Sequence, residues 1–309
     1  MERTRDNPWL HRYAILVAFS TFILIIAGAL VTSNDAGLSV PDWPTTFGTF
    51  RMPRMVGGVL FEHGHRMIAG TVGILTIILA IWLWLKESRG WVRWLGMVSV
   101  GAVIAQAALG GITVLFYLPV AISVSHAALA QIFFCLNFSL ALFTSQGWQW
   151  GEPSAEDAAL PSLRLLAPAT TVAILIQLIL GAAYRHGGLG IVPHMVGATV
   201  VSLLSAWMVA RVFLRFSCQP RLVRAAMLLL GLVLVQVFLG VGAYVEKLRY
   251  RDAVQPLPPV VQTTTAHVAL GALVLIASLY FTYQVYRAIA SQGPELLTHR
   301  GSAPEGARV

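Results

Sequence analysis

Charged residues and cysteines are scarce in this chain of 309 residues. Only 11% of the residues are charged, against about 25% in an average soluble domain, which excludes a soluble globular protein. Two cysteines cannot form a disulfide scaffold, and no Cys and His spacing resembles a zinc site. Hydrophobic residues make up 57% of the chain, which excludes a disordered or collagen-like protein. A mean hydropathy of +0.74 indicates a membrane protein with several spans.

Eight apolar stretches are long enough to cross a bilayer, since a spanning helix needs roughly 20 mostly apolar residues. They cover residues 13–31, 65–85, 94–117, 122–144, 163–184, 191–210, 222–245 and 263–286. We therefore expect an all-α integral membrane protein with eight transmembrane helices.

Basic residues are distributed unequally between the two ends of these helices. The formal charge is +8, from 21 Lys and Arg against 13 Asp and Glu. With the amino terminus inside, 14 of the basic residues fall in inner segments and 6 in outer loops, while Arg66 lies at a helix mouth. Inner loops of membrane proteins are enriched in Lys and Arg. We expect a multi-pass plasma-membrane protein with both termini in the cytoplasm, and the charge indicates topology rather than nucleic-acid binding.

A Gln-x-x-x-Gly pattern recurs in the third, fifth and seventh apolar stretches. Its copies are Gln106–Gly110, Gln177–Gly181 and Gln236–Gly240, and Gly28 resembles a degenerate fourth copy in the first stretch. Because the first stretch takes part in this repeat, a cleaved signal peptide is the less favoured interpretation of it. The repeat predicts four helix hairpins of similar construction.

Each hairpin carries one histidine near the start of its second helix, namely His65, His126, His194 and His267. Any one of them is explained by a hydrogen bond to a neighbouring helix. Four at one depth favour another explanation, because imidazoles on facing helices are good ligands for haem iron. Four histidines supply two pairs of ligands, and the glycines would let helices approach a flat macrocycle closely.

We expect the pairs to form within halves, His65 with His126 and His194 with His267. The polar segment 145–162 reads as a cytoplasmic linker between residues 1–144 and residues 163–309, which end in a cytoplasmic tail. The predicted architecture is two pseudo-symmetric four-helix bundles, an arrangement that membrane proteins with internal repeats adopt.

One acidic residue breaks the symmetry of the two halves. Glu62 lies three residues before His65, on the same helix face, and no other carboxylate lies within about a turn of the four histidines. An acid at a helix start also favours the helix dipole, but beside His65 and Arg66 we interpret Glu62 as a proton donor or acceptor. Arg66 is a candidate contact for a haem propionate, since guanidinium groups bind carboxylates in pairs of hydrogen bonds.

The first outer loop, residues 33–61, is the longest segment predicted outside the membrane. It is rich in proline, glycine and aromatic residues, and Pro41 and Pro44 flank Asp42 and Trp43. A loop of this length and composition is more typical of a folded lid than of a flexible tether.

Taken together, three motifs resemble those of the haem A synthase family. They are residues 36–44 (Ala-Gly-Leu-Ser-Val-Pro-Asp-Trp-Pro), residues 61–70 (Phe-Glu-His-Gly-His-Arg-Met-Ile-Ala-Gly) and the Gln-x-x-x-Gly hairpins. The resemblance covers all eight helices. It implies an oxidoreductase that converts haem O to haem A, by oxidising the methyl group at porphyrin C8 to a formyl group through hydroxylated intermediates.

The resemblance also implies a role for each candidate residue. His65 and His126 would belong to the substrate haem site, Glu62 would be needed for chemistry, and His194 and His267 would hold a haem B cofactor. Implied partners are the haem O synthase (a farnesyltransferase) and the terminal oxidase whose assembly needs haem A, with an unidentified electron donor.

The chain departs from the family in its cysteines. Many bacterial members carry a cysteine pair in the first outer loop, where this chain has Val40 and Thr46, and a second pair in the third outer loop is also missing. Cys135 is predicted inside the fourth helix and Cys218 on the cytoplasmic side, so they cannot pair. A cysteine-based electron route is therefore excluded.

Two other functions fit parts of this pattern. A dihaem b-type cytochrome that only transfers electrons explains the four histidines, but leaves Glu62 and the lid without a role. A transporter with a histidine proton or metal path predicts no haem, and the near absence of acidic residues in the spans speaks against it.

Overall fold

The computed structural model describes residues 7–148, 155–157 and 159–290. Within them the chain forms eight long α-helices, a single 3₁₀ turn and no strand. The helices are α1 (Pro8–Ser33), α2 (Gly58–Lys86), α3 (Gly90–Leu115), α4 (Val120–Phe143), α5 (Leu163–Arg185), α6 (Ile191–Arg215), α7 (Pro220–Arg249) and α8 (Pro258–Ala288), and the 3₁₀ turn is η1 (Gln146–Trp148).

All eight helices are long and apolar enough to span a membrane, so the predicted all-α membrane fold is confirmed. Several begin earlier than the apolar stretches suggested, because helix geometry continues into less apolar residues. Helix α2 begins at Gly58 rather than at residue 65, and α8 begins at Pro258. At about 1.5 Å per residue, the 31 residues of α8 exceed the roughly 30 Å hydrocarbon core. The outer ends of these helices therefore reach beyond the hydrocarbon region.

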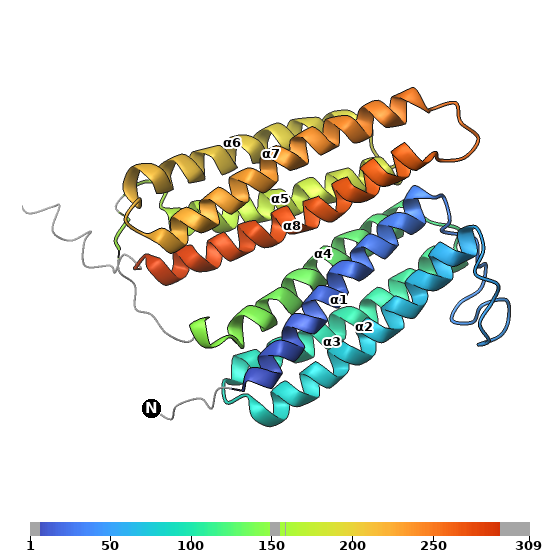
Figure 1. The fold of residues 1–309 in the computed structure, drawn as a ribbon, viewed down its shortest axis with the longest axis horizontal. Coiled ribbons are helices and arrows are strands. Elements are labelled where there is room, and N and C mark those ends of the chain that lie inside the picture. Colours follow the sequence, from blue (N-terminus) through green and yellow to red (C-terminus); the bar gives the residue numbers. More distant parts are fainter. Residues whose placement is uncertain (1–6, 149–154, 158, 291–309) are drawn as a thin grey trace, which may run out of the picture.

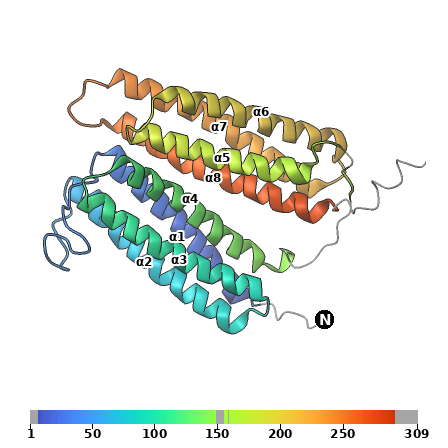
Figure 2. The same ribbon diagram turned by 180° about the vertical axis from the view of Figure 1, so that it is seen from behind.

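The helices form two groups of four, α1–α4 and α5–α8, that lie side by side (Figure 1). Within each group every helix packs against its neighbours in a ring, and the groups meet where α1 and α4 contact α8 and where α4 contacts α5. Figure 2 shows the same two groups from behind. The arrangement agrees with the predicted pair of bundles.

Each group has its own hydrophobic core, and a third cluster joins the groups. The core of the second group includes the fully buried Met208, Leu229 and Phe281. The joining cluster comprises Ile25 of α1, Phe134 of α4, and Ala272 and Ile276 of α8. Because α8 touches helices of both groups, it is the most buried of the eight spans.

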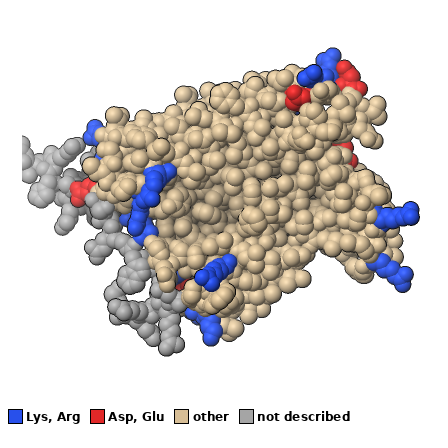
Figure 3. All heavy atoms as spheres, in the orientation of Figure 1, with Lys and Arg blue, Asp and Glu red and all other residues tan. Residues whose placement is uncertain are grey.

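Large hydrophobic side chains cover the outer surface, as expected for helices in lipid. On the face drawn in Figure 3, Lys, Arg, Asp and Glu gather toward the two ends of the helices and leave an uncharged band between them. This distribution fits a multi-pass membrane protein.

In the predicted linker, Asp157 binds to the ends of helices α5 and α6 in the second group. The carboxylate of Asp157 accepts hydrogen bonds from the Leu163 amide (2.6 Å) and from Arg211, with which it forms an ion pair at 2.9 Å. Residues 149–154 of the linker and the predicted tail, residues 291–309, lie outside the described residues.

Candidate haem sites and the lid

Each of the four histidines packs against the repeat glycine of its own hairpin. The imidazole of His65 lies over Gly28, that of His126 over Gly110, that of His194 over Gly181 and that of His267 over Gly240. A methyl group added at Gly181 or Gly240 would lie 2.8 Å from an imidazole carbon, and one at Gly28 or Gly110 would lie 3.1 or 3.3 Å from the ring. A side chain at Gly181 or Gly240 would therefore displace the ring, whereas Gly28 and Gly110 leave the ring tightly packed against the helix.

The histidines come together within each half. The ring centroids of His194 and His267 are 6.2 Å apart, with the rings nearly perpendicular. In the first half, His65 lies within electrostatic range of His126. One ring nitrogen of His126 and one of His267 are buried and have no hydrogen-bond partner within the described part of the chain.

The glutamines of the repeat hold the second-half histidines, a role that the sequence pattern did not assign to them. The side-chain amide of Gln177 donates to the backbone carbonyl of His194 (2.8 Å) and lies 3.0 Å from its Nδ1. Gln236 donates in the same way to the carbonyl of His267 (3.0 Å). Such contacts orient the ring of a ligand histidine. The recurrence of Gln four residues before Gly is the sequence signal from which this contact could have been inferred.

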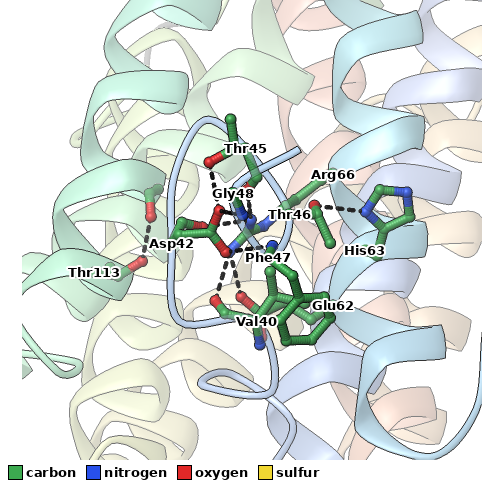
Figure 4. A network of polar contacts seen from close by, with 11 residues as sticks. Val40, Asp42, Thr45, Thr46, Phe47, Gly48, Glu62, His63, Arg66 and Thr113 are labelled. Carbon is green, nitrogen blue, oxygen red and sulfur yellow. Dashed lines mark hydrogen bonds and ion pairs between the residues drawn. The ribbon is translucent and has the colours of Figure 1, made fainter. Parts of the chain in front are cut away.

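Glu62 is buried, with 4% of its surface exposed, and both its carboxylate oxygens are engaged. Oε1 lies 2.6 Å from Nη2 of Arg66, and Oε2 accepts a hydrogen bond of 2.7 Å from the backbone N–H of Val40 (Figure 4). The acid thus joins α2 to the lid, one turn before His65. A buried carboxylate needs such partners, because an unpaired charge away from water is strongly unfavourable.

Arg66 fastens the lid through three backbone carbonyls. Nη1 donates to the carbonyls of Asp42 (2.7 Å) and Thr45 (3.0 Å), and Nη2 donates to that of Val40 (3.0 Å). Sequence reasoning missed these contacts, since backbone acceptors leave no trace in the sequence. The predicted contact of Arg66 with a haem propionate stays a prediction.

The lid runs from Asn34 to Gly57, a few residues shorter than predicted, because α2 begins at Gly58. Asp42 is the hub of its turn and accepts hydrogen bonds from the Thr45 hydroxyl and from the amides of Phe47 (2.7 Å) and Gly48 (2.9 Å) (Figure 4). These donors, the Thr45 hydroxyl first, lower the pKa of the Asp42 carboxyl to about 2. The lid is therefore a folded structure, as its composition indicated.

The lid packs on the outer ends of α2 and α3, the helices that carry His65 and Gly110. Trp43 packs on α3 at Gly111, where an added methyl group would lie 2.7 Å from the indole ring. Gly111 follows Gly110, which faces His126. On the α2 side, the hydroxyl of Thr46 lies 2.9 Å from Nδ1 of His63. His63 therefore faces the lid, whereas His65 faces Gly28.

The two lid positions at which related proteins were expected to carry cysteine are buried here. Val40 is fully buried and Thr46 is 5% exposed. Each is tied to α2 without a covalent bond, Val40 through Glu62 and Thr46 through His63. Cys135 and Cys218 are free thiols.

Comparison with known proteins supports the reading of these motifs. Residues 54–199 match the family of cytochrome oxidase assembly proteins designated COX15-CtaA. The chain is 32% identical over 114 residues to the haem A synthase of Lysinibacillus sphaericus, 28% over 181 residues to that of Shouchella clausii and 32% over 150 residues to that of Bacillus licheniformis.

These three matches cover 36%, 57% and 47% of the chain and 37%, 59% and 49% of the respective relatives. The chain therefore matches between about a third and three fifths of the length of these curated relatives. The matches confirm the resemblance that the motifs predicted, and the matched family segment contains Glu62, Arg66, His65, His126 and His194.

Proposed function

We propose, from its similarity to the haem A synthase family, that this chain is a haem A synthase. It would oxidise the C8 methyl group of haem O to a formyl group, through hydroxylated intermediates. His65 and His126 would hold the substrate haem O, and His194 and His267 would hold a haem B cofactor. The product would serve the assembly of a terminal oxidase.

The observation that carries this proposal is the asymmetry between two otherwise similar histidine pairs. Only His65 has a carboxylate three residues before it; the matching residues before His126, His194 and His267 are Ser123, Ile191 and Thr264. Within the described residues, only the first half carries a folded lid, whose Trp43 packs on α3 at Gly111. A protein that merely carried electrons between two equivalent haems would need neither.

The residues of both halves suit a haem. The four glycines let each imidazole pack closely against the neighbouring helix, which would fix the ring of a ligand histidine in place. The buried, unpartnered ring nitrogens of His126 and His267 are available as ligands. When bound, haem B would supply the one-electron transfers that connect the reaction to a reductant.

In the first half, Glu62 would hold or accept a proton at Oε2, the oxygen that faces the Val40 amide. Arg66 would keep the carboxylate in place through its contact with Oε1. Trp43 and the lid would exclude water from the substrate, which protects a reactive site from side reactions. Glu62 is thus the proposed catalytic residue, and Arg66 a positioning residue.

The proposed setting is the plasma membrane, with both termini in the cytoplasm and the lid outside. The excess of basic residues on the inner segments supports this orientation. A haem O synthase is the proposed partner that supplies the substrate.

The test is to purify the protein from membranes of cells that make haem O, extract its haems and identify them by mass. Haem B together with haem O, a hydroxylated haem or haem A would support the proposal. Haem B alone, in two equivalents and unchanged after haem O is supplied, would favour the dihaem electron-transfer cytochrome instead.

A further inference from the structure

A cationic side chain bridges the two halves at their outer ends. Arg185 is the last residue of α5, and its Nη2 reaches α1, where it donates to the carbonyl of Ala29 (2.7 Å) and to the hydroxyl of Ser33 (2.7 Å). The second half thus contributes this side chain to the surface of the first. Arg185 joins the helix groups at the level of the candidate haem sites.

The contacts of Arg185 lead to both histidine pairs. Ala29 follows Gly28, over which the His65 ring lies. The Ser33 hydroxyl also forms hydrogen bonds with the hydroxyls of Thr264 (2.9 Å) and Thr265 (3.0 Å). These threonines precede His267 by three and two residues. The charge of Arg185 in turn acts on His267.

Within the described part of the chain, the charge of Arg185 has no buried counter-ion. Among the described residues it forms no ion pair, and its hydrogen-bond acceptors are a neutral carbonyl and a neutral hydroxyl. Asp35 acts on it electrostatically but is exposed to solvent. A half-buried guanidinium with neutral partners is strongly stabilised by a carboxylate. This site therefore favours an anionic ligand.

We propose that Arg185 is a positioning residue shared by the two haem sites. It would bind a propionate carboxylate of the haem held by His194 and His267. Its charge would raise the reduction potential of that haem and, to a smaller extent, of the haem held by His65 and His126. A nearby cation favours the reduced form of a haem because reduction adds a negative charge. The inference rests on the proposed haem sites.

The experiment uses the full-length protein purified with its haems, and compares Arg185→Gln with Arg185→Lys. Redox titration followed by absorbance gives the midpoint potentials, and transfer of haem to apomyoglobin gives its rate of loss. Arg251→Gln is the matched control, since Arg251 is an exposed outer-loop residue 73% open to solvent. That control should match the wild type in both readouts.

We expect Arg185→Gln to lower the potential of one haem clearly and of the other less, and to speed haem loss several-fold. Arg185→Lys should keep the potentials near those of the wild type but still lose haem faster, because an ammonium group cannot form the paired hydrogen bonds of a guanidinium.

If Arg185→Gln shows wild-type potentials and wild-type haem retention, the proposed role of Arg185 is overturned, while the proposed function stands. If Arg185→Gln does not accumulate, Arg185→Lys decides, and wild-type haem retention in it overturns the proposal. A wild-type protein without any haem would overturn the proposed function first, so the two failures are distinguishable.

Discussion

The two halves contain the same glycine and histidine contacts but differ in what surrounds them. In the second half, Gln177 and Gln236 bind the backbone of the histidines directly. In the first half His126 also bonds to the backbone of Gln106, and Glu62 and Arg66 add polar contacts that hold a lid. The comparison teaches that a repeated helix hairpin can keep its glycine and histidine contacts while one copy gains a buried acid and a lid.

The largest effect is expected from removing Glu62, the acid that distinguishes the first half from the second. Glu62→Gln keeps the shape and the Val40 contact but removes the charge and the proton exchange. We expect haem A formation to fall at least about 100-fold, the usual contribution of general acid–base catalysis, while haem content is retained. Mass analysis of extracted haems measures both.

Ser123→Ala is the matched control for this variant, because Ser123 stands at the same place before His126. Serine is not an acid–base group at neutral pH, so this variant removes no proton exchange. Haem A formation should stay within about two-fold of the wild type. Haem A formation retained in Glu62→Gln would contradict the catalytic role of the acid.

The packing of a histidine ring on a glycine, which both halves share, is tested by adding a methyl group at the glycine. In Gly240→Ala the new methyl group would lie 2.8 Å from the His267 imidazole, so the ring must move. We expect the variant to lose roughly tenfold in haem B affinity, as when a positioning contact of a metal ligand is removed. Pyridine haemochrome spectra of the purified protein measure the haem B content.

Gly231→Ala on the same helix is the control, since a methyl group there meets nothing within 4 Å. It should bind haem B normally and unfold at the same or a slightly higher temperature, because alanine favours a helix over glycine. Equal haem content in both variants would show that the ring does not depend on the glycine beside it.

The variant Arg66→Lys tests how strongly Arg66 holds the lid of the first half. A lysine cannot donate to three carbonyls and a carboxylate at once, so the lid should open more often. We expect hydrogen exchange in residues 36–56 to become about tenfold faster, which corresponds to a loss of about 1.4 kcal/mol in the free energy of lid opening. Haem A formation should fall as well. Exchange in the α5–α6 turn of the second half should stay unchanged, and parallel loosening of that turn would indicate general unfolding instead.

The smallest effect concerns the turn inside the lid. The Asp42 carboxyl has a pKa lowered to about 2 by its hydrogen bonds, so the ionised form stabilises the folded lid. That stabilisation is complete above the ordinary pKa of about 3.9 and disappears as the pH falls toward 2. Proteolysis of the lid by pepsin should accelerate over this pH window, and the Asp42→Asn variant should lack the acceleration. A wild-type rate that is flat over this window would contradict the role of Asp42.

Much of this site could be predicted from the chain, because its signals are periodic. The eight spans followed from apolar length alone, and the presence of one histidine in each of four hairpins followed from the repeat. The packing of each imidazole on a glycine came from the structure. The contacts of Arg66 with Val40, Asp42 and Thr45 could not be predicted, since any residue offers the same backbone carbonyl. The contacts of Arg185 with Ala29 and Ser33 were equally hidden, because these partners lie more than 150 positions away.

By itself the sequence determined that the chain lies in a membrane, that its helices recur in hairpins, and that one hairpin alone carries an acid beside its histidine. These properties depend on hydrophobicity and on spacing along a single helix. The tertiary structure alone decided which groups complete the sites: the lid carbonyls on Arg66, the amide on Glu62 and the bridge from Arg185 to α1. Such contacts arise where segments distant in the chain pack together, and packing depends on the shapes of both surfaces rather than on either segment.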